Sequence, residues 1–231
     1  MFGASLITFS GFAANELMHL TVLTSFYLFL AQLFVLEKLL EISPSAPWSK
    51  RFVWTMIMGL LLGLSVLGGH PQITFYSLLF LGPYWLFWWV VKRKGSYGKL
   101  GLYGFLYAIV GLGIGAGQFL PMLEFTRQST RASGLSTAAL ERFNFPISDL
   151  VTFVLPFAKF DPNHTLEAFV NNGWPTDERY VYMGIVGLGF ALAGMLFIRR
   201  LGSRAVFFVA VALLAMLFAF GSQFTTGYIF A

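Results

Sequence analysis

The stretch that decides the fold is FVWTMIMGLLLGLSVLGGHPQITFYSLLFLGPYWLFWWVV, residues 52–91, which contains no Asp, Glu, Lys or Arg. The turn GGHPQ at 68–72 divides it, and Gly and Pro are strong breakers of regular structure. Each half approaches the roughly 20 apolar residues that a helix needs to cross a hydrocarbon core of ~30 Å. Because backbone groups in lipid must be paired within their own segment, both halves are predicted to be membrane-spanning helices.

Similar apolar stretches lie on both sides of this pair. We expect six full spans, at 20–36, 52–68, 73–91, 100–120, 180–198 and 205–220, and a partial span at 2–14. The chain is 57% hydrophobic and only 11% charged, whereas soluble domains are about 25% charged. The predicted fold class is therefore all-α, a polytopic transmembrane bundle that forms a single membrane domain over 1–231. The short first stretch and the apolar end predict an internal fragment of a longer protein.

The charges separate according to the predicted sides of the membrane. Ten of the fifteen basic residues fall on one side: Lys38, Lys50, Arg51, Lys92, Arg93, Lys94, Lys99, Arg199, Arg200 and Arg204. The positive-inside rule therefore makes loops 37–51, 92–99 and 199–204 cytoplasmic. The opposite side has eight of the ten acids and all three histidines, so functional residues are expected on the outer face. The exterior segment 121–179 is predicted to form a cap, with an interfacial or re-entrant helix at 147–157.

Several classes of function are disfavoured. The net charge of +5 comes from loops at span ends, as topology requires, so nucleic-acid binding is not expected. The absence of cysteine excludes disulfides and thiolate metal sites. The histidines have no ligand spacing, so no metal or other cofactor is predicted within the chain, and the metal dependence of a longer protein stays open. The glycines of GLGIGAG at 111–117 and the pair Gly59 and Gly63 are interpreted as helix-packing residues rather than a nucleotide cradle.

Two outer positions contain histidine. His70, in the turn between two spans, is either a solvated turn residue or a donor to a charged ligand. Glu16 and His19 are three residues apart, so a continuous helix would place them on one face. They form either a solvated helix end or a site, because ionisable groups that enter a membrane are costly unless paired or functional.

A third outer group follows the span at 100–120. Glu124 and Arg127 have helical spacing, and they form either a surface ion pair or a rim that binds phosphate through the planar guanidinium. Arg131 and Arg179 are predicted to join that rim. These exterior arginines run against the positive-inside rule, which an anionic ligand would explain.

Several motifs in order along the chain resemble the bacterial YfhO-type membrane proteins. The most specific are Gly69-His70-Pro71-Gln72 and Gln118-Phe119-Leu120-Pro121 with Glu124. Further matching motifs are Phe9-Ser10-Gly11-Phe12, His19, Leu36-Glu37-Lys38-Leu39-Leu40, Phe75-Tyr76, Arg131, Phe145-Pro146, Leu155-Pro156 and Glu178-Arg179-Tyr180. The resemblance covers nearly all 231 residues.

The resemblance implies a protein similar to GT-C glycosyltransferases. Such an enzyme takes a sugar from a polyprenyl-phosphate donor and transfers it to an envelope acceptor, here at the outer face of a bacterial cytoplasmic membrane. The family's catalytic acid is expected upstream of this chain, so no catalytic residue is assigned. The predicted substrate-binding residues are Glu16, His19, His70, Gln72, Glu124, Arg127, Arg131 and Arg179. Two other functions stay open: a transporter or flippase for a lipid-linked substrate, and a non-catalytic envelope assembly protein.

Overall fold

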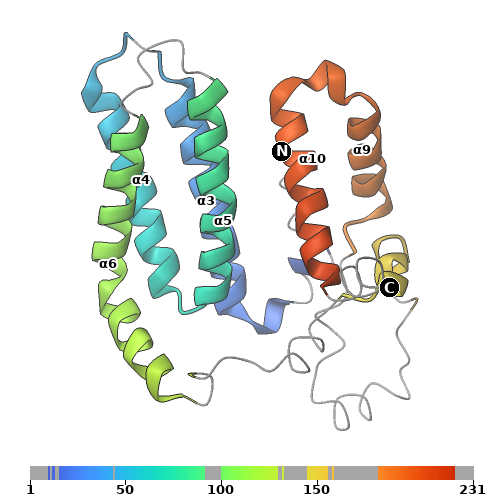
Figure 1. Cartoon of the computed structure of the whole chain (residues 1–231), viewed down its shortest axis with the longest axis horizontal. Helices are drawn as coiled ribbons and strands as arrows, with labels where there is room; N and C mark the ends of the chain where they lie inside the picture. Colours follow the sequence, from blue (N-terminus) through green and yellow to red (C-terminus); the bar gives the residue numbers. More distant parts are fainter. Residues whose placement is uncertain are drawn as a thin grey trace, which may run out of the picture. The chain divides into compact units, whose positions relative to one another are not determined.

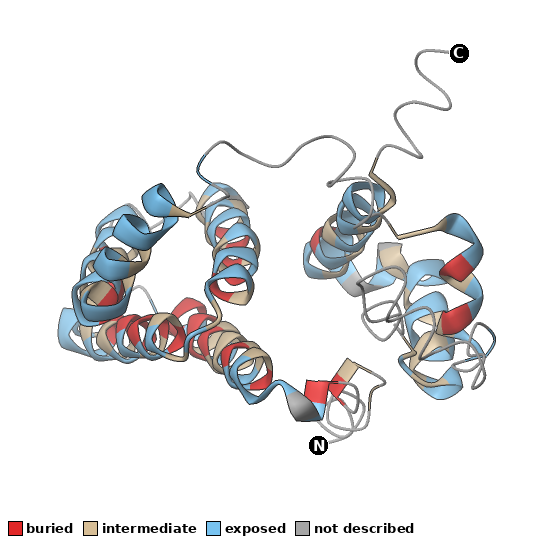
Figure 2. Cartoon of the chain, turned by 90° about the horizontal axis from the view of Figure 1, so that it is seen from below, coloured by how far each residue is buried: buried red, intermediate tan, exposed pale blue. Residues whose placement is uncertain are grey.

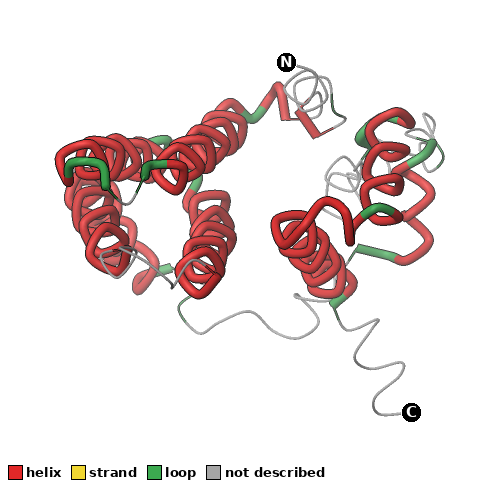
Figure 3. The backbone as a smooth tube through the Cα atoms, turned by 90° about the horizontal axis from the view of Figure 1, so that it is seen from above, coloured by secondary structure: helices red, strands yellow, loops and turns green. Residues whose placement is uncertain are grey.

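The computed structural model describes residues 10, 12–13, 16–43, 45–91, 100–129, 132, 145–155, 158 and 182–221. All regular elements in these ranges are helices, and none of them is a strand (Figure 3). Five helices are long and apolar enough to cross a membrane: Leu20–Glu41, Trp48–Leu67, Pro71–Val90, Leu100–Gln128 and Gly202–Phe220. The all-helical class is therefore confirmed, and the five apolar helices indicate a lipid environment.

The chain divides into two compact units. Unit 1 comprises Met1–Met18 and Gly134–Ala231, and unit 2 comprises His19–Ser133. Unit 2 contains α3 (Leu20–Glu41), α4 (Trp48–Leu67), α5 (Pro71–Val91) and α6 (Leu100–Gln128). Unit 1 contains the short 3-10 helices η1 (Glu16–Met18) and η3 (Ile147–Phe153), together with α9 (Ile185–Leu196) and α10 (Ile198–Phe220). The predicted partial span 2–14 lies almost entirely outside the described residues.

The helices of unit 2 pack in an order that differs from their order along the chain. Helix α6 packs on α4, α4 on α3, and α3 on α5, whereas α5 and α6 are not closely packed (Figure 1). The buried residues of unit 2 lie along the contacting faces of these helices (Figure 2). Since successive helices reverse direction, α4 and α6 run parallel. His19, the turn before α5 and the last turns of α6 thus share one end of unit 2, here called the outer end; the opposite end is the inner end.

Paired glycines bring α4 and α6 together. A Cβ atom at Gly59 would lie 2.8 Å from Val110, and one at Gly63 would lie 2.5 Å from Ile114. In the reverse direction, a Cβ at Gly111 would lie 2.4 Å from Leu62. Gly115 faces Val66 in the same way. Each helix thus inserts branched side chains beside the glycines of the other, the small-residue packing expected in a membrane.

The prediction for the glycine stripe is only partly right. Gly111 and Gly115 form the interface, as expected. Gly113 and Gly117 have open space where a Cβ would stand. Positions separated by four residues share a helix face, whereas those separated by two do not, so only alternate glycines of the stripe can meet α4.

Interhelical polar bonds complete the packing of unit 2. Tyr107 of α6 donates to Oε1 of the fully buried Gln32 of α3 at 2.7 Å. The hydroxyls of Ser65 and Thr74 lie 2.9 Å apart and connect α4 to α5 near the outer end. Such bonds satisfy buried polar groups that lipid could not solvate.

Helix α3 is longer than predicted. It continues through Glu37 to Glu41, so the predicted loop 37–51 begins too early. Leu36, Leu39 and Leu40 are all buried, which extends the apolar face by another turn. The charged side chains also have partners: Tyr84 of α5 donates to Glu37, and Lys38 pairs with Glu41 at 2.8 Å. These contacts give partners to charged side chains whose presence in the sequence predicts a loop.

Helix α6 is also longer than predicted. The predicted span ends at residue 120, whereas the helix bends at its outer part and continues past Pro121 to Gln128 (Figure 1). A proline within a helix removes one hydrogen bond and kinks the axis without always ending it. Because Gly115 lies beside Val66 near the end of α4, the last twelve residues of α6 extend about 18 Å beyond α4. The first eight residues of the predicted exterior cap 121–179 are therefore helical.

Unit 1 differs more from prediction. The expected full span 180–198 corresponds to α9, whose 12 residues reach about 18 Å, so a sixth span is not confirmed. The predicted loop 199–204 is reduced to a break at Gly202, where φ is 77°, within α10. Helix η3 begins at Ile147, as the helix predicted at 147–157 does, but it has 3-10 geometry and ends at Phe153. The backbone N–H of Phe145 donates to the Ala219 carbonyl at 2.7 Å, so this segment contacts the end of α10.

Candidate functional site

His70 is the residue that precedes the first turn of α5. Its ring Nδ1 accepts a hydrogen bond from the backbone N–H of Ile73 at 3.4 Å. Pro71 occupies the first helical position, where its missing N–H removes no helix bond. An N-cap side chain normally accepts from the third helical residue, as His70 does. The sequence left open a solvated turn residue or a ligand donor, and the structure shows a half-buried helix cap.

The cap also determines which ring nitrogen faces a ligand. Since Nδ1 accepts from Ile73, the neutral ring has its proton on Nε2. Nε2 can then donate to an anionic oxygen at the outer end. A structural role and a binding role for His70 are thus compatible.

A substitution pair separates the two roles. We expect His70→Ala to lower the free energy of unfolding by about 1 kcal/mol, because an orphan N–H of α5 loses its acceptor. His70→Asn should retain most of the stability, since asparagine is a preferred N-cap residue. Thermal unfolding in detergent, followed by circular dichroism, measures both. Equal destabilisation by the two substitutions would show that the cap contributes nothing.

Gln72, Glu124 and Arg127 lie at the same outer end. Gln72 donates through Nε2 to the Tyr76 hydroxyl at 2.9 Å, one turn further along α5. Glu124 and Arg127 are exposed in the last turns of α6. In the part of the chain that the structure describes, no ion pair joins the latter two side chains. The structure thus does not show the surface ion pair, and the phosphate-binding rim stays a prediction.

The continuous helix that would place Glu16 and His19 on one face does not form. Glu16 lies in the 3-10 helix η1, where it is only 8% exposed, and His19 precedes α3 with a non-helical backbone at φ −112° and ψ 69°. The helix that would have placed both side chains on one face is therefore interrupted at His19. The two residues also belong to different units. Arg131 and Arg179 lie outside the described residues.

An apolar cavity of about 250 Å³ opens at the outer end of unit 2. We call it the outer cavity. Leu62 and Val66 of α4 line it, together with Pro71 and Phe75 of α5 and Phe119 and Met122 of α6. It touches both neighbours of His70 in the sequence, and Met122 lies two residues before Glu124. The residues His70, Gln72, Glu124 and Arg127, here called the polar rim, lie at the same outer end of unit 2 as this cavity.

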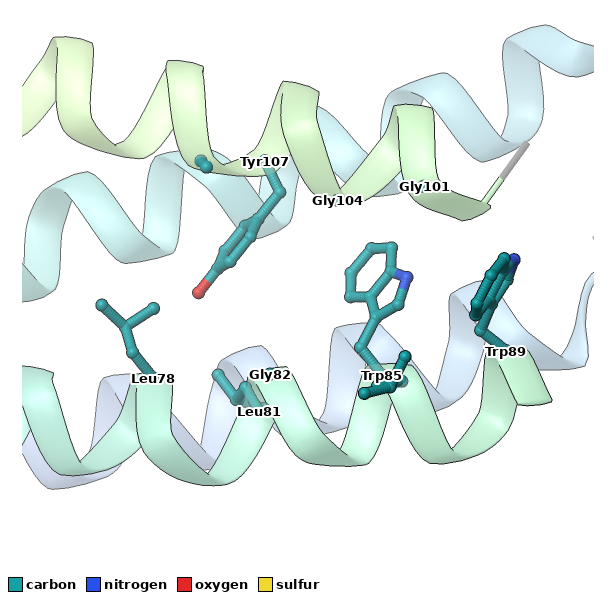
Figure 4. A pocket seen from close by; sticks show the side chains of 10 residues that line it. Leu78, Leu81, Gly82, Trp85, Trp89, Gly101, Gly104 and Tyr107 are labelled. Carbon is teal, nitrogen blue, oxygen red and sulfur yellow. The ribbon is translucent and has the colours of Figure 1, made fainter. Parts of the chain in front are cut away.

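A second apolar space lies between α5 and α6 towards the inner end (Figure 4). This inner groove has a volume of about 460 Å³ and shares Leu78 with the outer cavity. Trp85 and Trp89 extend from α5 towards α6, and Tyr107 extends from α6 towards α5 (Figure 4). The rings of Trp85 and Tyr107 stack with centroids 6.2 Å apart.

Three polar contacts were not predicted from the sequence. Glu37 with Tyr84 joins residues far apart in the chain, so no local pattern could indicate it. Arg51, assigned only a topological role, is 5% exposed and binds backbone carbonyls at the end of α3. Asp149, 7% exposed in η3, accepts from the Ser148 hydroxyl at 3.1 Å. For this last contact the sequence offers one signal, namely an acid within the otherwise apolar stretch 147–157.

No group of three or more His, Cys, Asp or Glu side chains with metal-binding geometry occurs in the described ranges. Comparisons with known protein families, with curated proteins and with solved structures found no match to this chain. The resemblance to YfhO-type proteins, and the activity that it implies, stay predictions.

Proposed function

We propose that this chain binds a lipid-linked sugar at the outer face of a bacterial cytoplasmic membrane and is part of an enzyme that transfers the sugar to an envelope acceptor. The observation that carries the proposal is the outer cavity beside the polar rim. A polyprenyl-phosphate sugar has a hydrocarbon part and an anionic part, and these two environments match them. Five membrane-length helices support the lipid setting.

Each rim residue has a chemical role in this proposal. Arg127 binds the phosphate through its planar guanidinium, which forms stronger, directed bonds with such oxygens. The Nε2–H of His70 can donate to an anionic oxygen, and Gln72 offers an amide to the sugar or phosphate. Glu16, His19, Glu124, Arg131 and Arg179 stay substrate-binding residues predicted from the sequence.

The test is sugar transfer from a radiolabelled polyprenyl-phosphate donor in membranes that contain the protein. Arg127→Ala and Gln72→Ala should each reduce transfer, with a loss of roughly 10- to 100-fold for the arginine, because a charge-assisted bond contributes about 1.5–3 kcal/mol. Lys50→Ala is the matched control, because Lys50 is exposed at the inner end. Normal protein levels with unchanged transfer in both rim variants would rule out the rim as the binding site.

One observation favours the second candidate, a transporter or flippase. The longer α3 brings Glu37 into a span-length helix, where Tyr84 binds it. Ionisable residues in such helices often mark substrate or proton pathways. Under this alternative, Glu37→Gln abolishes translocation of a fluorescent lipid-linked sugar across proteoliposomes, whereas under the transferase proposal sugar transfer persists in that variant.

A further inference from the structure

The inner groove between α5 and α6 is held open by residues without side chains. A Cβ atom at Gly82 or at Gly101 would meet nothing within 4 Å, and one at Gly104 would meet only Trp85, at 3.7 Å. Larger residues at these positions would occupy the groove. The two helices therefore leave space between them instead of packing as α4 and α6 do.

The lining of the groove presents little polarity to a ligand. The Trp85 indole N–H donates to the Leu100 carbonyl at 3.2 Å, and the Tyr107 hydroxyl donates to Gln32. These polar atoms are already paired within the protein. Leucine, tryptophan and glycine make up most of the remaining surface, so a hydrocarbon matches it better than a sugar or a peptide.

The dimensions fit a hydrocarbon chain better than a helix. Between Leu78 and Trp89 the groove follows eleven residues of α5, or about 16 Å, so its volume of about 460 Å³ gives a cross-section of roughly 30 Å². An α-helix about 10 Å in diameter has a cross-section of roughly 80 Å². A single hydrocarbon chain is narrow enough to enter.

The charge at the inner end indicates which lipid supplies that chain. The residues that join α5 to α6, 92–99, read KRKGSYGK and contain four basic and no acidic residues. They lie outside the described residues; in the sequence they follow Val91, the last residue of α5, and precede Leu100, the first residue of α6. Basic sequence at the cytoplasmic ends of transmembrane helices attracts anionic headgroups. Trp89 lies near that end, and tryptophan is enriched at membrane interfaces.

We propose that the inner groove binds one hydrocarbon chain of an anionic phospholipid whose headgroup lies at the inner end of unit 2. The lipid is a bound partner of α5 and α6 and fills the space that their glycines leave. This site is separate from the outer rim and does not depend on the sugar-transfer proposal.

The test measures tryptophan fluorescence of the whole chain in phosphatidylcholine vesicles. Phosphatidylglycerol or phosphatidylcholine with brominated chains is added at equal mole fractions, because bromine quenches a nearby indole. Brominated phosphatidylglycerol should quench at least about threefold more effectively, and the preference should fall in high salt. Trp85→Phe combined with Trp89→Phe should remove the part of the quenching that depends on phosphatidylglycerol.

Variants that fill the groove complete the design. Gly82→Leu and Gly101→Leu should abolish the preference, whereas Gly113→Leu, on open surface away from the groove, should retain it. Circular dichroism checks that helicity is unchanged, and the tryptophan double variant provides the answer if a leucine variant does not fold. Equal quenching by the two lipids would indicate general bilayer contact only and overturn the proposal. A preference retained in both filled variants would also overturn it, as would stronger displacement by polyprenyl phosphate than by unlabelled phosphatidylglycerol.

Discussion

Replacement of Arg51 by alanine is expected to lower the free energy of unfolding by about 1.5–3 kcal/mol, because one buried and one partly buried carbonyl would lose a charged donor. Nη2 of Arg51 donates to the Ser43 carbonyl at 2.8 Å and to the Ile42 carbonyl at 3.2 Å. The last carbonyls of a helix have no partner within the helix. Arg51, in the first turn of α4, supplies a partner to the carbonyls of Ile42 and Ser43, which directly follow α3. It thereby joins the two helices across their loop.

Two matched variants make this prediction specific. Lys50→Ala removes the neighbouring, exposed cation and should change stability by less than about 0.5 kcal/mol. Arg51→Lys keeps the charge but loses the planar fork, so it should recover only part of the stability. Thermal unfolding in detergent measures the differences, and proteolysis between residues 42 and 47 reports on the loop. If Arg51→Ala and Lys50→Ala had the same effect, the bonds to the carbonyls would have no energetic role.

Gly111→Val is expected to destabilise the protein by about 1–3 kcal/mol, the usual range for overpacking of a close contact. A Cβ at this position would lie 2.4 to 2.7 Å from three atoms of Leu62, including the Cβ of that residue, which rotation of the leucine cannot move away. Helices α4 and α6 would have to separate. The measurement is again thermal unfolding, compared at equal detergent concentration.

Gly113→Ala is the control within the same helix. Its Cβ would meet nothing within 4 Å, so the substitution should be neutral or stabilise by up to about 1 kcal/mol through helix propensity. Adding Leu62→Ala to Gly111→Val should restore part of the lost stability, because the smaller residue makes room. Additive losses in the double variant would mean that Gly111 and Leu62 do not meet.

The spans were predictable because their signal is local. Hydropathy and the GGHPQ turn located α4 and α5 within a few residues, and charge alternation predicted that His19, His70 and Glu124 share one end of unit 2. The ends of α3 and α6 were not predictable to the same degree. Whether the chain continues past Glu37 depends on Tyr84, which is remote in sequence. Whether α6 continues past Pro121 depends on a bend of the helix axis that the sequence does not specify.

The candidate site was predicted as a set of residue types rather than as a geometry. The motif around His70 indicated the correct turn, but not that the ring caps α5, because that bond depends on the exact start of the helix. The outer cavity and the inner groove could not be predicted. They arise because α4 pairs with α6, and this pairing depends on which glycines of the stripe face α4.

The partnership of α4 with α6 has a consequence for biosynthesis. Helix α6 is synthesised last of the four helices of unit 2. After α3, α4 and α5 have entered the membrane, the face of α4 that contains Gly59 and Gly63 therefore still lacks the helix on which it packs. The Leu62 and Val66 side chains then face lipid until α6 arrives. A nascent chain arrested after α5 should therefore be an assembly intermediate, vulnerable to membrane proteases, and release of α6 from the translocon should be the step that makes this half of the protein resistant.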